Sequence, residues 1–128
     1  MARFVPARFH GFFDYFMGVL LIVAPWLFGF HRGGAETWVM VALGAAIIVY
    51  SLLTDYDLGI SRRFHIESRL HLDTHLWLDG LAGLLLFFSP WLFGFADIIV
   101  APHVILGLVE MGAALLTAYP TRRRITTV

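Results

Sequence analysis

Apolar and polar positions along this chain fall into long blocks. Four apolar segments, at about 11–30, 35–54, 76–95 and 101–119, are separated by short polar stretches. A helix of roughly 20 residues crosses the ~30 Å hydrocarbon core of a bilayer, whereas membrane-spanning strands need a two-residue alternation that these segments lack. The pattern predicts an all-α protein, a four-helix transmembrane bundle, as one domain covering residues 1–128.

The blocks of the first half recur in the second half. Residues 10–30 read HGFFDYFMGVLLIVAPWLFGF and residues 75–95 read HLWLDGLAGLLLFFSPWLFGF, with identities at polar as well as apolar positions. Two tandem helical hairpins follow, repeat 1 at about 9–56 and repeat 2 at about 74–120, joined by a linker at about 57–73. Because each repeat has two spans, we expect a pseudo-two-fold axis along the membrane normal.

Composition and charge agree with a membrane protein. The chain is 59% hydrophobic and only 14% charged, against roughly 25% charged residues in soluble domains. Eight of the nine arginines fall on the side that holds both termini and the linker, and only Arg32 falls on the other. The positive-inside rule therefore places both termini in the cytoplasm. A lipid bilayer is the expected partner; no basic and aromatic surface indicates nucleic acid, and the lack of cysteine excludes thiolate sites.

Ionisable side chains inside the apolar segments are the candidate chemistry. His10 and Asp14 recur as His75 and Asp79, and the i, i+4 spacing puts each pair on one helical face. The pseudo-two-fold could bring both pairs into one polar cluster near the cytoplasmic end. Three interpretations are open: a hydrogen-bonded clamp between the repeats, proton handling, or ligation of a metal or haem.

A second set of possible metal ligands overlaps this cluster. His71, His75 and Asp79 form an i, i+4, i+8 ladder of imidazole and carboxylate groups, the ligands that zinc and iron use. Repeat 1 has Pro6 in place of His71, so the ladder is not duplicated. We therefore predict no cofactor, while metal and haem stay open.

Glu110 breaks the symmetry of the repeats, since its matching residue is Ile47. A charge at the centre of the bilayer costs about 2.5–3.5 kcal/mol. We expect a neutral carboxyl, or one paired with a group such as Tyr50. A proton or substrate site and an oligomer contact are the alternatives.

The hexapeptide PWLFGF ends the first span of each repeat. Proline removes the N–H that the carbonyl four residues earlier would accept, and Ser89 could donate to the Leu85 carbonyl instead. We expect the aromatic residues of the motif, including Phe30 and Phe95, to form a belt at the outer interface. The predicted interface anchors are Pro25, Trp26, Pro90 and Trp91.

Small residues also recur in register. Gly18 and Gly83 lie one turn beyond the two aspartates, and Gly44 and Ser51 of the second span match Gly107 and Ala114 of the fourth. Small residues at such positions let transmembrane helices approach closely. We predict that Gly44, Ser51, Gly107 and Ala114 form packing seams, and that Gly18 and Gly83 permit close approach of their helices.

The duplicated Pro-Trp unit, preceded by His-x-x-x-Asp and followed by a second span, resembles the SPW repeat family of small prokaryotic integral membrane proteins. Ser89-Pro90-Trp91 matches the tripeptide that names the family, while repeat 1 has Ala24 in place of the serine. The resemblance implies a multi-pass protein of a prokaryotic cytoplasmic (inner) membrane and carries no catalytic residue.

Size and residue content favour a non-enzymatic membrane module, an accessory subunit or a homo-oligomer in a larger membrane complex. Most of the chain spans the membrane, and no nucleophile, phosphate loop or large polar cavity is evident. Two other classes stay open. One is a small proton-coupled transporter or channel-like protein that uses intramembrane Asp and Glu, and the other is a His-ligated metal or haem redox protein.

Overall fold

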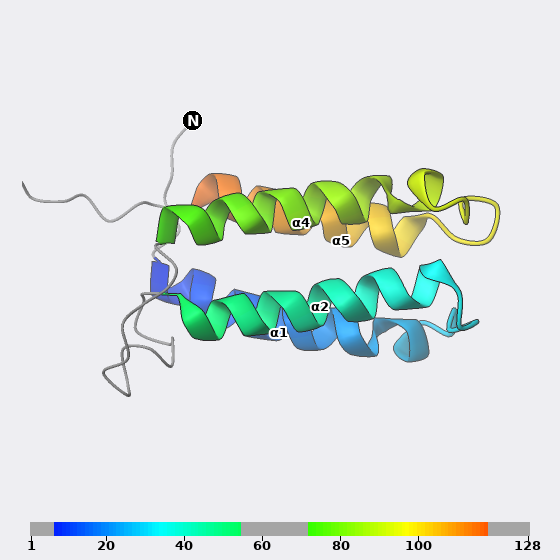
Figure 1. The fold of residues 1–128 in the computed structure, drawn as a ribbon, viewed down its shortest axis with the longest axis horizontal. Coiled ribbons are helices and arrows are strands. Elements are labelled where there is room, and N and C mark those ends of the chain that lie inside the picture. The colour runs from blue at the N-terminus through cyan, green and yellow to red at the C-terminus, as the bar shows by residue number, and fades with distance from the viewer. Residues whose placement is uncertain (1–6, 55–71, 118–128) are drawn as a thin grey trace, which may run out of the picture.

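The computed structural model describes residues 7–54 and 72–117, which form four α-helices and no strand. Helices α1 (Ala7–Leu27) and α2 (Ala35–Leu53) make one hairpin, and α4 (Leu72–Leu92) and α5 (Ala101–Leu116) make the other. Figure 1 shows the two hairpins side by side, with both of their loops at one end of the bundle. The predicted all-α, four-helix architecture is confirmed. Residues 57–71 of the predicted linker, which include His71, lie outside the described residues, and residues 72–73 belong to α4.

Three of the helices are long and apolar enough to cross a membrane. The spans are Phe9–Leu27, Ala35–Leu53 and Thr74–Leu92, of 19 residues each. The fourth, α5, has 16 residues, about 24 Å at 1.5 Å per residue, and is shorter than predicted. It ends early because Thr117 adopts an extended conformation (φ −75°, ψ 129°), as Thr54 does after α2 (φ −81°, ψ 143°).

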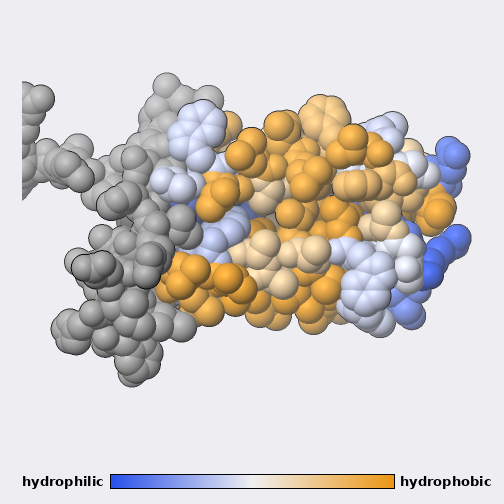
Figure 2. All heavy atoms as spheres, in the orientation of Figure 1, coloured by the Kyte–Doolittle hydropathy of each residue, from blue (hydrophilic) through white to orange (hydrophobic). Residues whose placement is uncertain are grey.

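The outer surface of the bundle is apolar. Figure 2 shows hydrophobic residues over the helices and hydrophilic residues at the end that carries the two interhelical loops. Large side chains on all four helices face outward, and Phe16 and Trp77 are 65% and 71% exposed. A surface of this extent needs an apolar environment around it. The chain is a multi-pass membrane protein.

Each hairpin is packed along one glycine seam, where its two helices approach closely. A Cβ on Gly44 would lie 2.6 Å from the Gly18 carbonyl oxygen, and one on Gly83 would lie 2.8 Å from that of Gly107. Only glycine permits such close approach of two helix backbones. The predicted packing role of Gly44 and Gly107 is confirmed, and Gly18 and Gly83 lie against the second helix of their own hairpin.

The PWLFGF motif terminates its helix by a defined backbone turn. Gly29 and Gly94 have φ values of 73° and 74°, in the left-handed region that glycine tolerates. The Phe30 N–H then donates to the Pro25 carbonyl at 2.9 Å. This is the hydrogen bond of a Schellman cap, which satisfies a carbonyl at the helix end. The same bond occurs in repeat 2, from the Phe95 N–H to the Pro90 carbonyl at 2.8 Å.

The last phenylalanine of each motif belongs to the core. Phe30 and Phe95 are only 5% and 3% exposed, and their rings pack against the His103 ring at centroid distances of 5.4 and 4.7 Å. The prediction that they join an aromatic belt is wrong, because the left-handed glycine turns the chain back toward the bundle. Trp26 and Trp91 do face outward, at 52% and 55% exposure.

Ser89 compensates for the proline that follows it. Pro90 has no N–H for the Leu86 carbonyl, and the Ser89 hydroxyl donates to that carbonyl at 2.6 Å. The predicted acceptor, Leu85, was one residue away; its carbonyl is the one that the Ser89 N–H reaches in a regular helix. Repeat 1 has Ala24 here and offers no hydroxyl.

Replacing Ser89 with alanine is expected to lower the free energy of unfolding by about 1–3 kcal/mol, because a buried carbonyl loses its donor. Unfolding by SDS in mixed micelles measures this difference. Ser51→Ala is the matched control, since Ser51 is equally buried and its hydroxyl has no hydrogen-bond partner among the described residues. Equal losses in both variants would contradict the assigned role of Ser89.

Candidate functional site

Four ionisable side chains meet inside the bundle, at the end away from the interhelical loops. His10 and His75 are each the fourth residue of their helices, α1 and α4, and Asp14 and Asp79 lie one turn further in. All four are buried, with exposures between 0 and 2%. The predicted polar cluster is therefore present in the described residues, and we call these four residues the His/Asp cluster.

Each histidine bonds most closely to the aspartate of the other hairpin. His10 Nε2 lies 2.6 Å from Asp79 Oδ2, and His75 Nε2 lies 2.6 Å from Asp14 Oδ2. The distances to the aspartate of the same helix are longer, at 3.1 Å in both repeats. The cluster thus links α1 to α4, and with them the two hairpins.

Threonines at the ends of α2 and α5 complete the cluster. Thr54 Oγ1 lies 2.6 Å from His75 Nδ1, and Thr117 Oγ1 lies 2.6 Å from His10 Nδ1. The two threonines match in the repeat alignment at an offset of 63, together with the leucines before them. That match was the available signal, but threonine is not an ionisable residue and was not predicted to belong to the site.

The threonines fix which imidazole nitrogen carries hydrogen. Each hydroxyl donates its proton to the carbonyl four residues earlier, Thr54 to Tyr50 and Thr117 to Ala113, both at 2.6 Å. The hydroxyl oxygen is then left to accept, so Nδ1 of His75 and of His10 must donate to it. This assignment directs Nε2 of both histidines toward the carboxylates.

The two aspartates differ in their support. The Tyr50 hydroxyl donates to Asp79 Oδ1 in a short hydrogen bond, while repeat 2 has Ala113 at the position of Tyr50. Asp14 Oδ1 is buried and has no hydrogen-bond partner in the described part of the chain; it faces His10 Nε2 at 3.1 Å. The site therefore holds one carboxylate oxygen with spare capacity to accept.

Glu110 lies on the buried face of α5, two turns from Thr117, and is 1% exposed. Among the described residues, neither of its carboxyl oxygens has a hydrogen-bond partner. The predicted pairing with Tyr50 is not found, because the Tyr50 hydroxyl is used by Asp79. The buried apolar core of the bundle contains Leu21, Met40, Ile47 and Leu86.

Oxygen and nitrogen ligands for a metal ion converge in the His/Asp cluster. One ligand atom from each of its four residues can be chosen so that all lie within 4.8 Å of one another. The ladder with His71 is a different set, and its first residue is outside the described residues. The described geometry thus brings the two duplicated pairs together as a candidate metal site.

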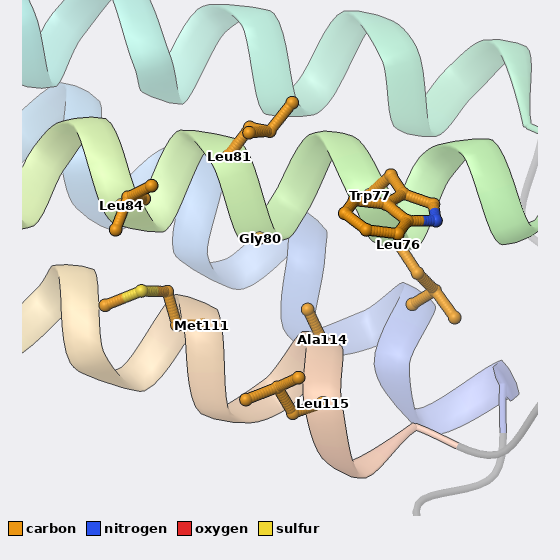
Figure 3. A pocket seen from close by; sticks show the side chains of 8 residues that line it. All are labelled: Leu76, Trp77, Gly80, Leu81, Leu84, Met111, Ala114 and Leu115. Carbon is orange, nitrogen blue, oxygen red and sulfur yellow. The ribbon is translucent and has the colours of Figure 1, made fainter.

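An apolar pocket of about 320 Å³ lies between α4 and α5 beside the cluster (Figure 3). Gly80 is one of its lining residues, and repeat 1 has Tyr15 at the matching position. Its lining offers no ionisable or nucleophilic side chain. The lining residues are Leu76, Trp77, Gly80, Leu81, Leu84, Met111, Ala114 and Leu115.

Comparison with known proteins agrees with the duplicated architecture. The family model of the SPW repeat domain matches residues 8–117, which include both hairpins and the whole His/Asp cluster. No curated protein and no solved structure matches the chain. The chain therefore belongs to the SPW repeat domain family.

Proposed function

We propose that this protein is a non-enzymatic module of a prokaryotic cytoplasmic membrane, with both termini in the cytoplasm, which acts as a subunit of a homo-oligomer or a larger membrane complex. The main observation behind this proposal is that the buried polar side chains bond to one another between the hairpins. In the His/Asp cluster, His–Asp contacts of 2.6 Å join the two hairpins, and no member is more than 2% exposed. The site as described is a closed internal clamp.

The surroundings of the cluster support this proposal. The pocket beside it is lined by apolar groups and glycine, apart from the Trp77 indole. A second pocket, at the outer end of the bundle, has an entirely apolar lining. It is formed by Phe28, Ala101, Pro102, Ile105 and Leu106. Neither offers the polar groups that a catalytic site needs. The exposed apolar faces are the surfaces available to a partner helix.

Cross-linking in native membranes tests the module. The chain has no cysteine, so single cysteines can be introduced one at a time. Trp77→Cys, on an exposed face, is expected to give a discrete adduct with a second copy or one partner protein; Ala114→Cys, at a buried position, is the control. Only monomer in the Trp77→Cys sample, or turnover of a substrate by the purified chain alone, would contradict the proposal.

A proton-coupled transporter is the second candidate, and one observation favours it. Glu110 is a buried carboxyl without a hydrogen-bond partner in the described residues, as expected of a group that binds a proton or a substrate. The buried apolar residues Leu21, Met40 and Leu86 argue against a continuous polar path across the bundle.

Proton flux into liposomes decides the role of Glu110. If the protein is a proton-coupled transporter, Glu110→Gln abolishes pH-driven flux, because the amide has nearly the same shape but cannot take up the proton. Glu36→Gln, at the start of α2, is the control for loss of a buried carboxyl elsewhere. Equal flux through the wild type and Glu110→Gln would remove the transporter candidate.

A further inference from the structure

We propose that the His/Asp cluster is a binding site for one divalent transition-metal ion of the zinc type. The inference goes beyond the proposed module, because it gives the clamp between the hairpins a ligand. It uses the same four residues, His10, Asp14, His75 and Asp79.

The donor set suits a borderline metal ion. Two imidazole nitrogens and two carboxylate oxygens make up an N₂O₂ set, and four protein ligands is the number found in structural zinc sites. Imidazole is a ligand for Zn²⁺, Fe²⁺ and Cu²⁺, whereas Mg²⁺ and Ca²⁺ prefer sites made of oxygen. The site therefore selects against the common hard cations.

The orientation of both imidazoles is the one that metal-binding histidines adopt. A ligating histidine usually donates its second ring N–H to a nearby acceptor, which holds the ring and its tautomer in place. Here Thr117 accepts from His10 Nδ1 and Thr54 accepts from His75 Nδ1. Nε2 of both rings consequently faces the carboxylates and could bind an ion when the ion displaces the proton that it shares with the carboxylate.

Tyr50 gives the same kind of support to a carboxylate. Its hydroxyl occupies Asp79 Oδ1, which leaves Asp79 Oδ2 to face both histidines, at 2.6 and 3.1 Å. Asp14 Oδ1 is fully buried and lies 3.1 Å from His10 Nε2, and no described residue gives it a hydrogen bond, so it is an oxygen that an ion could satisfy. A bound water or ion is one explanation for a buried acceptor of this kind.

The charge of the cluster balances with a divalent ion. With Nδ1–H directed to threonine, each contact of 2.6 Å between Nε2 and a carboxylate oxygen requires a shared proton. Two carboxylates and two such protons give no net charge. Two carboxylates, two neutral imidazoles and one M²⁺ ion also give none, so the ion brings no uncompensated charge into the low-dielectric interior.

The space is close to that of a zinc site. Tetrahedral bonds of about 2.0–2.2 Å place neighbouring ligand atoms roughly 3.4 Å apart. The corresponding atoms here lie within 4.8 Å of one another, with the closest pairs at 2.6 Å. Shifts of roughly one ångström in the side chains are thus enough. The two ring centroids are 5.7 Å apart and each ring contacts both carboxylates, so a haem plane does not fit between the rings.

Cobalt titration of the full-length protein tests the site. The purified chain is stripped with a chelator and titrated with Co²⁺, whose visible absorption is intense in a tetrahedral site. One equivalent is expected to bind, and Zn²⁺ is expected to displace it, while Mg²⁺ is not. Elemental analysis of the protein purified without a chelator gives an independent measure of the bound ion.

Matched variants assign the binding to the cluster. Asp14→Asn keeps the shape and is expected to weaken Co²⁺ binding at least 100-fold. Thr54→Val leaves all four ligands and is expected to weaken it about 10–100-fold. His103→Gln is the control, because His103 is a buried histidine outside the cluster.

Three outcomes would overturn the proposal: no tetrahedral absorption, binding unchanged in both cluster variants, or an equal loss in His103→Gln. Because Thr54→Val removes no ligand and no charge, it keeps the test valid if Asp14→Asn fails to fold. These titrations use the isolated chain. Absence of metal binding would therefore not contradict the membrane module, which the cross-linking experiment tests. Absence of cross-linked products would likewise not contradict metal binding.

Discussion

Replacing Asp79 with alanine is expected to lower the free energy of unfolding by about 3–5 kcal/mol, the cost of removing one partner from a buried ionic network. Asp79 accepts from the Tyr50 hydroxyl and contacts His10 and His75, so three polar groups lose a partner at once. In a closed interior, water does not replace it. Reversible unfolding by SDS in mixed micelles measures the change.

Asp97→Ala is the control for this prediction. Asp97 lies in the exposed loop between α4 and α5, and its removal is expected to change stability by less than about 0.5 kcal/mol. If Asp79→Ala were no more destabilising than Asp97→Ala, the cluster would not hold the hairpins together. The clamp on which the proposed module depends would then be wrong.

The second large effect is expected at the glycine seam of the second hairpin. Even a Cβ on Gly107 would lie 2.7 Å from both the Gly83 carbonyl oxygen and the Phe87 backbone nitrogen. Backbone atoms cannot move aside as a flexible side chain can, so Gly107→Leu must separate α4 from α5. We expect a loss of at least about 3 kcal/mol, the upper part of the range for overpacked interiors.

Gly112→Leu separates this packing effect from the general effect of replacing a helical glycine. Gly112 is in the same helix, and a Cβ there would meet nothing within 4 Å. Because glycine is a poor helix former, this variant is expected to be neutral or slightly stabilising. Similar unfolding curves for the two variants would contradict the close packing of α4 on α5.

Much of the architecture could be predicted from the sequence, because a duplicated pattern and long apolar blocks directly reflect helix length and pairing. The hairpins, the glycine seams and the meeting of the two His-x-x-x-Asp pairs follow from repeat and spacing alone. The end of α5 could not be predicted in the same way. Its apolar block continues to Tyr119, but the helix ends at Leu116. Thr117 adopts an extended conformation there, and its hydroxyl contacts the imidazole of His10.

Backbone conformation and hydrogen-bond direction account for the predictions that were wrong. Phe30 and Phe95 were predicted to join an aromatic belt because they are aromatic residues near the end of a span. The glycine before each adopts a left-handed backbone conformation, which directs the phenylalanine into the core. Tyr50 was expected to pair with Glu110, but its hydroxyl donates to Asp79. Neither result follows from hydropathy, since each depends on where one side chain points.

The threonines show what a repeat alignment can add to a search for ionisable groups. Thr54 and Thr117 match in register, and both bond a histidine of the cluster. Polar residues that recur in a duplicated chain are therefore candidates for one site, even where they carry no charge. The unmatched residues, Tyr50 and Glu110, mark where the two halves of the bundle differ.

A double-mutant cycle on Asp14 and His75 tests the central claim most directly, because the two residues are 61 positions apart and belong to different hairpins. Alanine is introduced at each position and at both, and the free energies of unfolding are compared. The structure predicts a coupling energy of about 1–3 kcal/mol for this pair, larger than that of Asp14 with His10 in its own helix. Additive effects for Asp14 and His75 would contradict a cluster shared between the hairpins.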